Sequence, residues 1–382
     1  CRPGRDSPHP GGPEPAIQHR PSGHTPPRHD PGFGAPRTTE TTPNHEWASV
    51  KRHNPGLLSN TGGSRIMVEL RDVCNLDSSN ISPIVWENLA GTIRDNYDDF
   101  DALIVLHGTN TLGYTGAALS FALVNPTKPV VITGSQVPSG RPATDAAMNI
   151  EHAVRVAVWP GGDISRMAGV VGVFGSHIIP GTRLKKTTSF DYDAFRSFSS
   201  ESIGRIGRLV NIDEDKLSKH KSYLHTGLNP PARRQADLRV EPEFDARIAS
   251  ITEFPAMSSA IFYSLVENCD VRGFVLRSFG AGDPSDSHRE AFEFLKERKI
   301  PIVVTTQAPN GTSNFQVNDT GAWLRTHNLA IPAYDMSVES QTTKLGWLLA
   351  KVDQGSLTYD GLCRDMVTDL RGEVNVLLET GL

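Results

Sequence analysis

The sequence predicts an α/β fold with a larger N-terminal domain, built on a parallel sheet, and a smaller C-terminal α/β domain. Short continuous apolar runs, typical of strands covered on both faces, alternate with segments whose apolar residues recur at helical spacing. A polar, proline-bearing stretch over residues 213–245 divides this alternation into two series, and we interpret it as an interdomain linker. Alternating strands and helices favour parallel sheets with right-handed crossovers.

The first series, residues 67–212, forms the predicted larger domain. A helix is predicted over Ile81–Tyr97, where Ser82 is a suitable N-cap and Pro83 suits the first turn. Further predicted elements are strands at Ala102–Leu106, Pro129–Thr133 and Gly169–Phe174, a helix that ends near Val124, and a helix over Ala146–Val158.

The second series, residues 246–382, forms the predicted smaller domain. Its predicted elements are helices over Ser259–Glu267, Ser287–Arg298 and Val338–Ala350, and strands at Gly273–Leu276 and Pro301–Thr305. We find no internal repeat beyond the strand–helix alternation that both series share.

Residues 1–66 differ from the rest of the chain. Most of this stretch is rich in proline, arginine and histidine and nearly free of valine, isoleucine and leucine. Such a segment cannot bury enough apolar surface to offset the entropy lost on ordering, so we predict a disordered tail. His19, His24 and His29 are interpreted as part of this solvated tail rather than as metal ligands.

Composition excludes several classes of protein. The net charge of -5 shows no basic excess, so neither nucleic acid nor a membrane surface is predicted as a partner. Four scattered cysteines without a CxxC pair argue against a zinc site and a disulfide framework, and fit a reducing compartment. Because no apolar run approaches the roughly 20 residues of a membrane helix, we expect a cytoplasmic protein.

Polar, small residues follow three of the predicted strands, at His107–Thr111, Gly134–Gln136 and Gly280–Asp283. Ligands of open parallel sheets bind beyond the carboxyl ends of the strands, and the helix after the first turn directs free N–H groups to the same place. This pattern predicts a pocket for a small polar molecule. The residues leave a second interpretation open, in which Thr109 and Thr111 only cap the helix. His107 is expected to pack under the turn.

Several motifs in order resemble the bacterial-type L-asparaginase family, in a cytosolic type I-like form, over roughly residues 68–352. They are LHGTNTLGYTGAALSFAL and KPVVITGSQVP near the first two strand ends, NLDSSNISPIVW at 75–86, GTRLKKTTSFDYDAF at 181–195, FVLRSFGAG, and IPAYDMSVESQTTKLGWLLA at 331–350. The resemblance implies hydrolysis of the side-chain amide of asparagine, and often of glutamine, without a metal or organic cofactor. It also implies a homodimer or homotetramer.

The resemblance implies roles for individual residues. Thr109 would be one of two active-site threonines, and Lys186 would be the base that accepts its proton. That role requires a neutral amine, so the pKa of Lys186 must be lowered by burial or by nearby positive charge, for which Lys185 is a candidate. Ser78 and Ser79 would bind the substrate's α-carboxylate or α-amino group, and Asp77 lies in the same loop. The alternative is that these residues form only a polar loop before the helix, without contacting substrate.

Two departures from the family pattern matter. Asn110 stands where the family has an aspartate that binds the substrate's α-ammonium group. The loss of such a charge-assisted hydrogen bond costs on the order of 1.5–3 kcal/mol. The only candidate for the family's first active-site threonine is Thr61, in Thr61-Gly62-Gly63-Ser64. The alternative is that this segment is an ordinary glycine-containing loop.

The chain begins with Cys1, and too few residues separate Thr61 from Asp77 for the family's usual strand and helix. We expect either a mistranslated N-terminus joined to a genuine body, which we favour, or the loss of the first β-α unit, which would leave an exposed sheet edge. Two other functions remain open. One is the asparaginase-like subunit of glutamyl-tRNA(Gln) amidotransferase, which needs a partner subunit; the other is a catalytically silent amino-acid-binding homologue.

Overall fold

The computed structural model describes residues 46–53, 65–159, 167–221, 238–315 and 318–375. All of them fall within one compact unit, Thr41–Leu382. Residues 1–45 and 54–64 lie outside the described residues, and with them Thr61 and the three histidines at 19, 24 and 29. Within the predicted tail 1–66, residues 46–53 form a strand and residues 65 and 66 begin the next one.

The larger sheet has eight strands among the described residues, in the order β11-β10-β7-β6-β5-β3-β1-β2. The strands are β1 (Glu46–His53), β2 (Arg65–Asp72), β3 (Ala102–Leu106), β5 (Pro129–Thr133), β6 (Gly169–Phe174), β7 (His177–Pro180), β10 (Gly204–Ile206) and β11 (Val210–Ile212). Only β3, β5 and β6 pair in parallel, and every other pairing in this sheet is antiparallel. The predicted parallel sheet therefore forms the centre of this larger sheet, and antiparallel strands that the sequence did not predict extend it on both sides.

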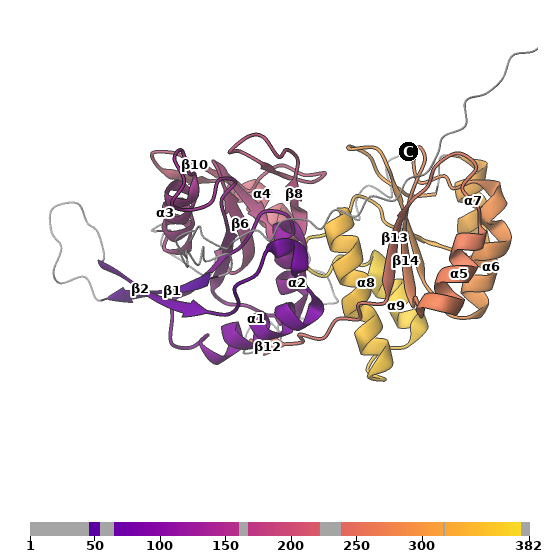
Figure 1. Cartoon of the computed structure of the whole chain (residues 1–382), viewed down its shortest axis with the longest axis horizontal. Helices are drawn as coiled ribbons and strands as arrows, with labels where there is room; N and C mark the ends of the chain where they lie inside the picture. Colours follow the sequence, from indigo (N-terminus) through magenta and orange to yellow (C-terminus); the bar gives the residue numbers. More distant parts are fainter. Residues whose placement is uncertain (1–45, 54–64, 160–166, 222–237, 316–317, 376–382) are drawn as a thin grey trace, which may run out of the picture. The chain divides into compact units, whose positions relative to one another are not determined.

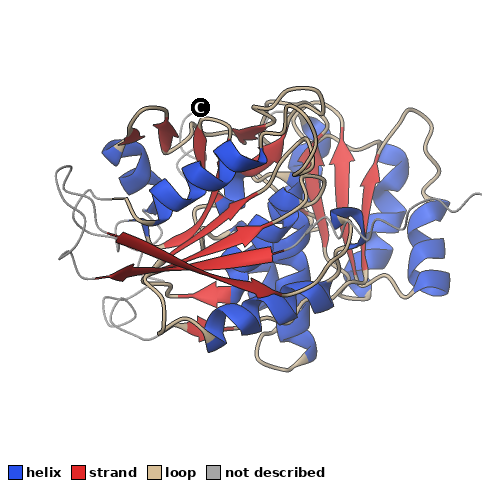
Figure 2. Cartoon of the chain, turned by 60° about the vertical axis from the view of Figure 1, so that its left-hand side comes forward, coloured by secondary structure: helices blue, strands red, loops and turns tan. Residues whose placement is uncertain are grey.

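Helices cover both faces of this sheet, as Figure 2 shows. They are α1 (Pro83–Asp95), α2 (Leu112–Ala122), α3 (Ala146–Ala157) and α4 (Glu214–His220). Apolar residues of α1 and α2 belong to one core cluster, and those of α3 and α4 belong to a second cluster on the opposite face. The central strands are apolar on both faces because each face packs against helices.

The smaller sheet is parallel throughout, in the order β13-β14-β15-β16. Its strands are β13 (Ile248–Thr252), β14 (Gly273–Ser278), β15 (Ile302–Thr306) and β16 (Ile331–Pro332). The helices α5 (Ala260–Cys269), α6 (Arg289–Glu297) and α7 (Asp319–Thr326) share a core cluster on one face, whereas α8 (Val338–Asp353) and α9 (Tyr359–Val367) contribute to the cluster of α1 and α2. The predicted α/β class, with a larger and a smaller sheet, is confirmed.

Two short antiparallel pairs complete the fold. One joins β4 (Leu123–Val124) to β12 (Arg239–Val240), and the other joins β8 (Leu184–Lys186) to β9 (Phe195–Ser197). The predicted linker 213–245 contains α4 and β12, while its residues 222–237 lie outside the described part of the chain. The domain limits at 67–212 and 246–382 remain predictions.

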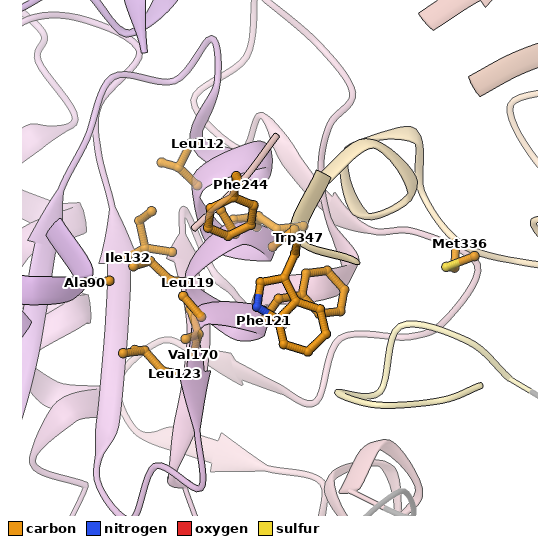
Figure 3. Packing of buried hydrophobic residues seen from close by; sticks show 14 of the residues in the cluster. Ala90, Leu112, Leu119, Phe121, Leu123, Ile132, Val170, Phe244, Met336 and Trp347 are labelled. Atoms are coloured by element: carbon orange, nitrogen blue, oxygen red, sulfur yellow. The ribbon is translucent and has the colours of Figure 1, made fainter. Parts of the chain in front are cut away.

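Helices α2 and α8 pack against each other between the two sheets (Figure 1). Phe121 of α2 stacks on Trp347 of α8 with 5.8 Å between ring centroids, and Phe244 lies in the same cluster (Figure 3). Burial of an aromatic side chain of this size stabilises the fold by about 1.5–3 kcal/mol. This contact joins α2, the helix that begins at the first polar turn, to α8, which packs on the smaller sheet.

Strand β2 forms one edge of the larger sheet and carries exposed apolar side chains. Ile66, Met67, Val68 and Leu70 are 38%, 48%, 50% and 62% exposed. An apolar edge strand is a template for pairing with another chain. None of the helices in the described part of the chain combines the length and apolar character needed to span a bilayer.

Candidate active site

The turn after β3 is fixed from below by His107. Its backbone N–H donates to Thr133 O at 2.8 Å, which ties the turn to the end of β5. Its ring is buried, with Nε2 2.9 Å from Thr115 Oγ1 and Nδ1 2.7 Å from Gly108 O. Trp86 Nε1 donates to the same Thr115 hydroxyl at 3.0 Å. The prediction that His107 packs under the turn is confirmed.

The loop that precedes α1 lies directly against this turn. Gly108 is needed there, because a Cβ atom at this position would lie 2.6 Å from Ser78 Oγ. Thr111 Oγ1 donates to Ser78 O at 2.7 Å, and Asp77 Oδ1 accepts from Ser79 N–H at 2.8 Å. Ser78 is buried and Ser79 is exposed. Two segments that the sequence singled out separately therefore form one surface.

The two threonines of the turn do not act as helix caps. Thr111 occupies the N-cap position of α2, but its side chain makes no capping hydrogen bond. Its hydroxyl holds the Ser78 loop instead, and the Thr109 hydroxyl faces a lysine amine. The alternative interpretation, in which both residues only cap the helix, is wrong.

Lys186, the last residue of β8, directs its amine to the turn. Its Nζ lies 2.7 Å from Thr109 Oγ1 and 3.4 Å from Asn110 Oδ1. The amide nitrogen of Asn110 donates to Ser79 Oγ at 3.1 Å. A hydroxyl, an amine, an amide and a second hydroxyl from three separate segments thus meet at the end of β3.

The environment of Lys186 disfavours the charged amine relative to that of a free lysine. Partial burial lowers the pKa of Lys186, because an ammonium ion loses hydration there. Among the described residues, no carboxylate forms an ion pair with it to offset this effect. Lys185 was a candidate for lowering that pKa further, but its charge is paired with Glu339, at 2.8 and 3.0 Å to the two carboxylate oxygens. Burial is therefore the cause, and the expectation for Lys185 is wrong.

The second polar strand end borders the same region. It follows β5, the parallel neighbour of β3, and Asp145 accepts from the N–H groups of Gln136 and Val137 at 3.0 Å each. Gln136 Nε2 donates to Asp191 O at 3.2 Å, which holds the β8–β9 connection beside this strand end. The third polar strand end, at Gly280–Asp283, follows β14 of the smaller sheet.

The sequence did not single out Glu339 and Arg183, which contact the lysine-bearing strand or lie just before it. Glu339 binds Lys185, and the buried Arg183 pairs with Asp335. Both pairs join residues more than a hundred positions apart, so no local spacing reveals them. Within the described ranges, no group of three or more histidine, cysteine, aspartate or glutamate residues could bind a metal ion.

Comparisons with known families agree with the resemblance in the motifs. Residues 38–218 match the model "Asparaginase, N-terminal", and residues 247–356 match "Glutaminase/Asparaginase C-terminal domain". The first match begins inside the stretch that was predicted to be a disordered tail. Together the two models span both sheets and include the turn at 107–111 and Lys186.

Individual relatives carry two kinds of name. The chain is 32% identical over 284 residues to an L-asparaginase of Thermococcus kodakarensis, which covers 74% of this chain and 80% of that protein. It is 31% identical over 303 residues to L-asparaginase 1 of Escherichia coli, covering 78% and 82%. It is also 30% identical over 305 residues to a subunit of the glutamyl-tRNA(Gln) amidotransferase of Thermococcus kodakarensis, covering 78% and 65%.

Solved structures give the same result. The thermostable L-asparaginase from Thermococcus kodakarensis superposes with a TM-score of 0.67 at 30% identity, over 80% of this chain and 85% of that one. L-asparaginase I from Vibrio cholerae superposes with a TM-score of 0.66 at 28% identity, over 79% and 85%.

Proposed function

Since the chain belongs to the asparaginase family, we propose that it is an L-asparaginase, which hydrolyses the side-chain amide of L-asparagine to L-aspartate and ammonia. The observation that carries the proposal is the 2.7 Å contact between Lys186 Nζ and Thr109 Oγ1. A threonine hydroxyl is a weak nucleophile until a base takes its proton, and this contact has the length such a transfer needs.

In the proposed reaction, neutral Lys186 accepts the proton of the Thr109 hydroxyl while the oxygen attacks the side-chain carbonyl carbon of the substrate. The tetrahedral intermediate then expels ammonia, which takes its proton from the Lys186 ammonium. This leaves an ester between Thr109 and the aspartyl group. One water molecule hydrolyses the ester: Lys186 accepts a proton from the water and returns it to the Thr109 oxygen as the ester bond breaks. The lowered pKa of Lys186 supports the first step, because it increases the fraction of neutral amine.

The substrate's α-amino and α-carboxyl groups would bind beside the nucleophile. Ser79 and Asn110 are exposed next to Thr109 and supply hydrogen-bonding groups, and the free N–H groups at the start of α2 favour a carboxylate. Ser78 and Asp77 would act in the same loop, with Asp77 shaping it through the Ser79 N–H. Asn110 carries no charge, so we expect the α-ammonium group to be bound weakly.

The remaining parts of the proposal follow from the family. Thr61 is the candidate for the second active-site threonine and lies outside the described residues. Glutamine is a second candidate substrate, no cofactor takes part, and the protein is proposed to act in the cytoplasm as a homodimer or homotetramer.

Ammonia release from L-asparagine tests the function. We expect Thr109→Val, which replaces the hydroxyl by a methyl group of similar size, to abolish most of the release. The matched control is Thr326→Val on the exposed face of α7; its hydroxyl has one hydrogen bond among the described residues, to Ala322 O of the same helix at 2.8 Å. Equal release by the wild type and Thr109→Val, with the control also unchanged, would refute the role of Thr109.

The amidotransferase relative supports a second candidate function, that of an asparaginase-like subunit that works with a partner. The purified chain alone distinguishes the two. Release of ammonia from asparagine without any added protein supports the asparaginase. Release from glutamine only when a co-purifying partner protein is present supports the amidotransferase role. Binding of asparagine with no release of ammonia, whether or not the partner protein is present, supports a catalytically silent binding protein.

A further inference from the structure

We propose that two acidic residues of the smaller-sheet region, Asp335 and Glu339, position Lys186 against Thr109 by holding the residues that precede it. This inference rests on the proposed function, in which Lys186 is the base. Among the described residues, no hydrogen bond joins either acid to the Thr109 hydroxyl, so we assign both a positioning role rather than a catalytic one.

The first contact is a buried ion pair at Arg183, three residues before Lys186. Arg183 Nη1 donates to Asp335 Oδ2 at 3.0 Å and to Asp335 O at 2.9 Å, and Nε donates to Gly372 O at 2.9 Å. Both side chains are almost inaccessible to solvent. A planar guanidinium bound on several sides has one permitted orientation, so Arg183 is held against the segment that leads into α8 and against the turn around Gly372.

The second contact is at Lys185, the residue next to Lys186. Its amine binds both carboxylate oxygens of Glu339, which lies in the first turn of α8. Ser340, the following residue of α8, donates its hydroxyl to Thr182 O. Residues on each side of Leu184 are therefore held by one helix end.

The geometry of a strand connects these contacts to the amine of Lys186. Successive side chains of a strand point to opposite faces, so holding Lys185 toward α8 directs Lys186 away from it and toward the turn after β3. β8 is only three residues long and pairs with the equally short β9. Such a strand has few ladder hydrogen bonds of its own, and the ion pairs supply the constraint that its length does not.

Position matters for this amine because its lysine side chain is long and flexible. Its only described partners are the Thr109 hydroxyl at 2.7 Å and the more distant Asn110 amide oxygen at 3.4 Å. A displacement of about 1 Å at a reacting group lowers turnover by up to roughly a hundredfold. Loss of the Glu339 contact would therefore reduce kcat without removing any group that touches the substrate.

A charge exchange at the partly exposed pair tests the proposal. We expect Lys185→Glu and Glu339→Lys, each alone, to lower kcat by roughly ten- to a hundredfold with little change in KM. The double variant restores the ion pair in reverse and should recover most of the lost kcat. Recovery in the double variant would support positioning, because a role for either residue in binding substrate would not be rescued by exchange.

Neutral variants separate position from charge. Lys185→Met and Glu339→Gln remove the ion pair without placing a new charge beside Lys186, and we expect each to lower kcat as well. If only the charge-reversed variants lose activity, the effect is electrostatic and the positioning role is wrong. Melting temperatures of all variants identify the temperatures at which every variant is folded, and kcat is compared at such a temperature.

Crystal structures give a readout that does not depend on activity. In Glu339→Lys the Lys186 amine should leave the Thr109 hydroxyl, and in the double variant it should return. An amine that stays within hydrogen-bonding distance of Thr109 in both single variants overturns the inference. A wild-type chain that releases no ammonia refutes the proposed function instead, and the crystal structures still decide the positioning.

Discussion

Lys186 and Lys344 are both shielded from water, one partly and the other completely, and their surroundings differ in kind. Lys344, in α8, is fully buried, with its Nζ 2.6 Å from Glu373 Oε1 and donating to the carbonyl oxygens of Met366 and Thr368 at 3.0 and 2.6 Å. Lys186 is only partly buried, but its described partners are a hydroxyl and an amide oxygen, neither of which carries a charge.

This difference shows that the partners of a lysine, more than its depth, decide what the amine can do. A carboxylate and two carbonyl oxygens surround the Lys344 amine, which fits a structural role. Burial alone would raise the pKa of Glu373, but the neighbouring Lys344 lowers it to about 2. Lys186 lacks such compensation in the described part of the chain, so burial lowers its pKa and prepares it to accept a proton.

The same substitution should reduce activity at Lys186 and stability at Lys344. The larger of the two effects is expected at Lys186. Lys186→Met should lower kcat for ammonia release by roughly 10²–10⁴-fold, because the base is removed. The free energy of unfolding, measured by urea denaturation, should change by no more than about 0.5 kcal/mol. Unchanged kcat in a folded variant would contradict the assignment of Lys186 as the base.

Lys344→Met should instead destabilise the fold. The substitution leaves Glu373 buried and unpaired, which costs about 3–5 kcal/mol of unfolding free energy. The measurement is urea denaturation beside the wild type. Adding Glu373→Gln should return part of the loss, since it removes the unpaired charge. A single variant as stable as the wild type would show that the Lys344–Glu373 pair does not stabilise the segment around Glu373.

Asn110→Asp places a carboxylate beside Lys186, which should raise the pKa of that amine, but it also gives the substrate's α-ammonium group a charged partner, and we expect this second effect to be the larger. We expect kcat/KM for asparagine to rise by about one to two powers of ten, because the carboxylate binds the substrate's α-ammonium group with a charge-assisted hydrogen bond worth about 1.5–3 kcal/mol. Steady-state kinetics on asparagine and on succinamic acid, which lacks the ammonium group, give the test. The proposed role of position 110 fails if asparagine gains nothing over succinamic acid.

A smaller effect is expected at Asp369, which shares the buried turn with Glu373. Burial and the neighbouring Glu373 carboxylate raise the pKa of Asp369 to about 8 from its usual 3.8. The unfolded chain thus loses this proton at lower pH than the folded one, so the group lowers stability progressively as pH rises from about 4 to about 8.

Asp369→Asn mimics the protonated carboxyl and should remove that dependence. We expect the variant's stability relative to the wild type to increase with pH across this window, by on the order of 1–2 kcal/mol, since the turn can relax toward solvent when the carboxyl ionises. Urea denaturation at pH 5 and pH 8 gives the comparison. A constant difference at the two pH values would show that Asp369 is already ionised in the folded protein.

The sequence predicted the central strands well because each is a continuous apolar run. β3, β5 and β6 have the predicted limits, and both sheets lie in the predicted order. The antiparallel strands β7, β10 and β11 were not predicted, since strands of three or four residues carry too little periodicity to distinguish them from loops. The pairing of β1 with β3 depends on contacts between segments that are distant in the sequence.

The site was predictable only in part for the same reason. Residue types and strand ends indicated a polar pocket at His107–Thr111, but the role of Lys186 came from the resemblance to a family, because the lysine is on a different strand. The contact of Ser79 with Asn110 and the pairs of Asp335 with Arg183 and Glu339 with Lys185 are set by packing between elements. No local pattern in the sequence reports such contacts.

The pH dependence of kcat/KM for ammonia release from L-asparagine tests the central claim most directly, with Lys186→Met measured in parallel. Because the pKa of Lys186 is lowered, kcat/KM should rise with pH through an apparent pKa below the value of about 10.4 for a free lysine, and this limb should vanish with the substitution. A wild-type profile that Lys186→Met reproduces in height and shape would contradict the account.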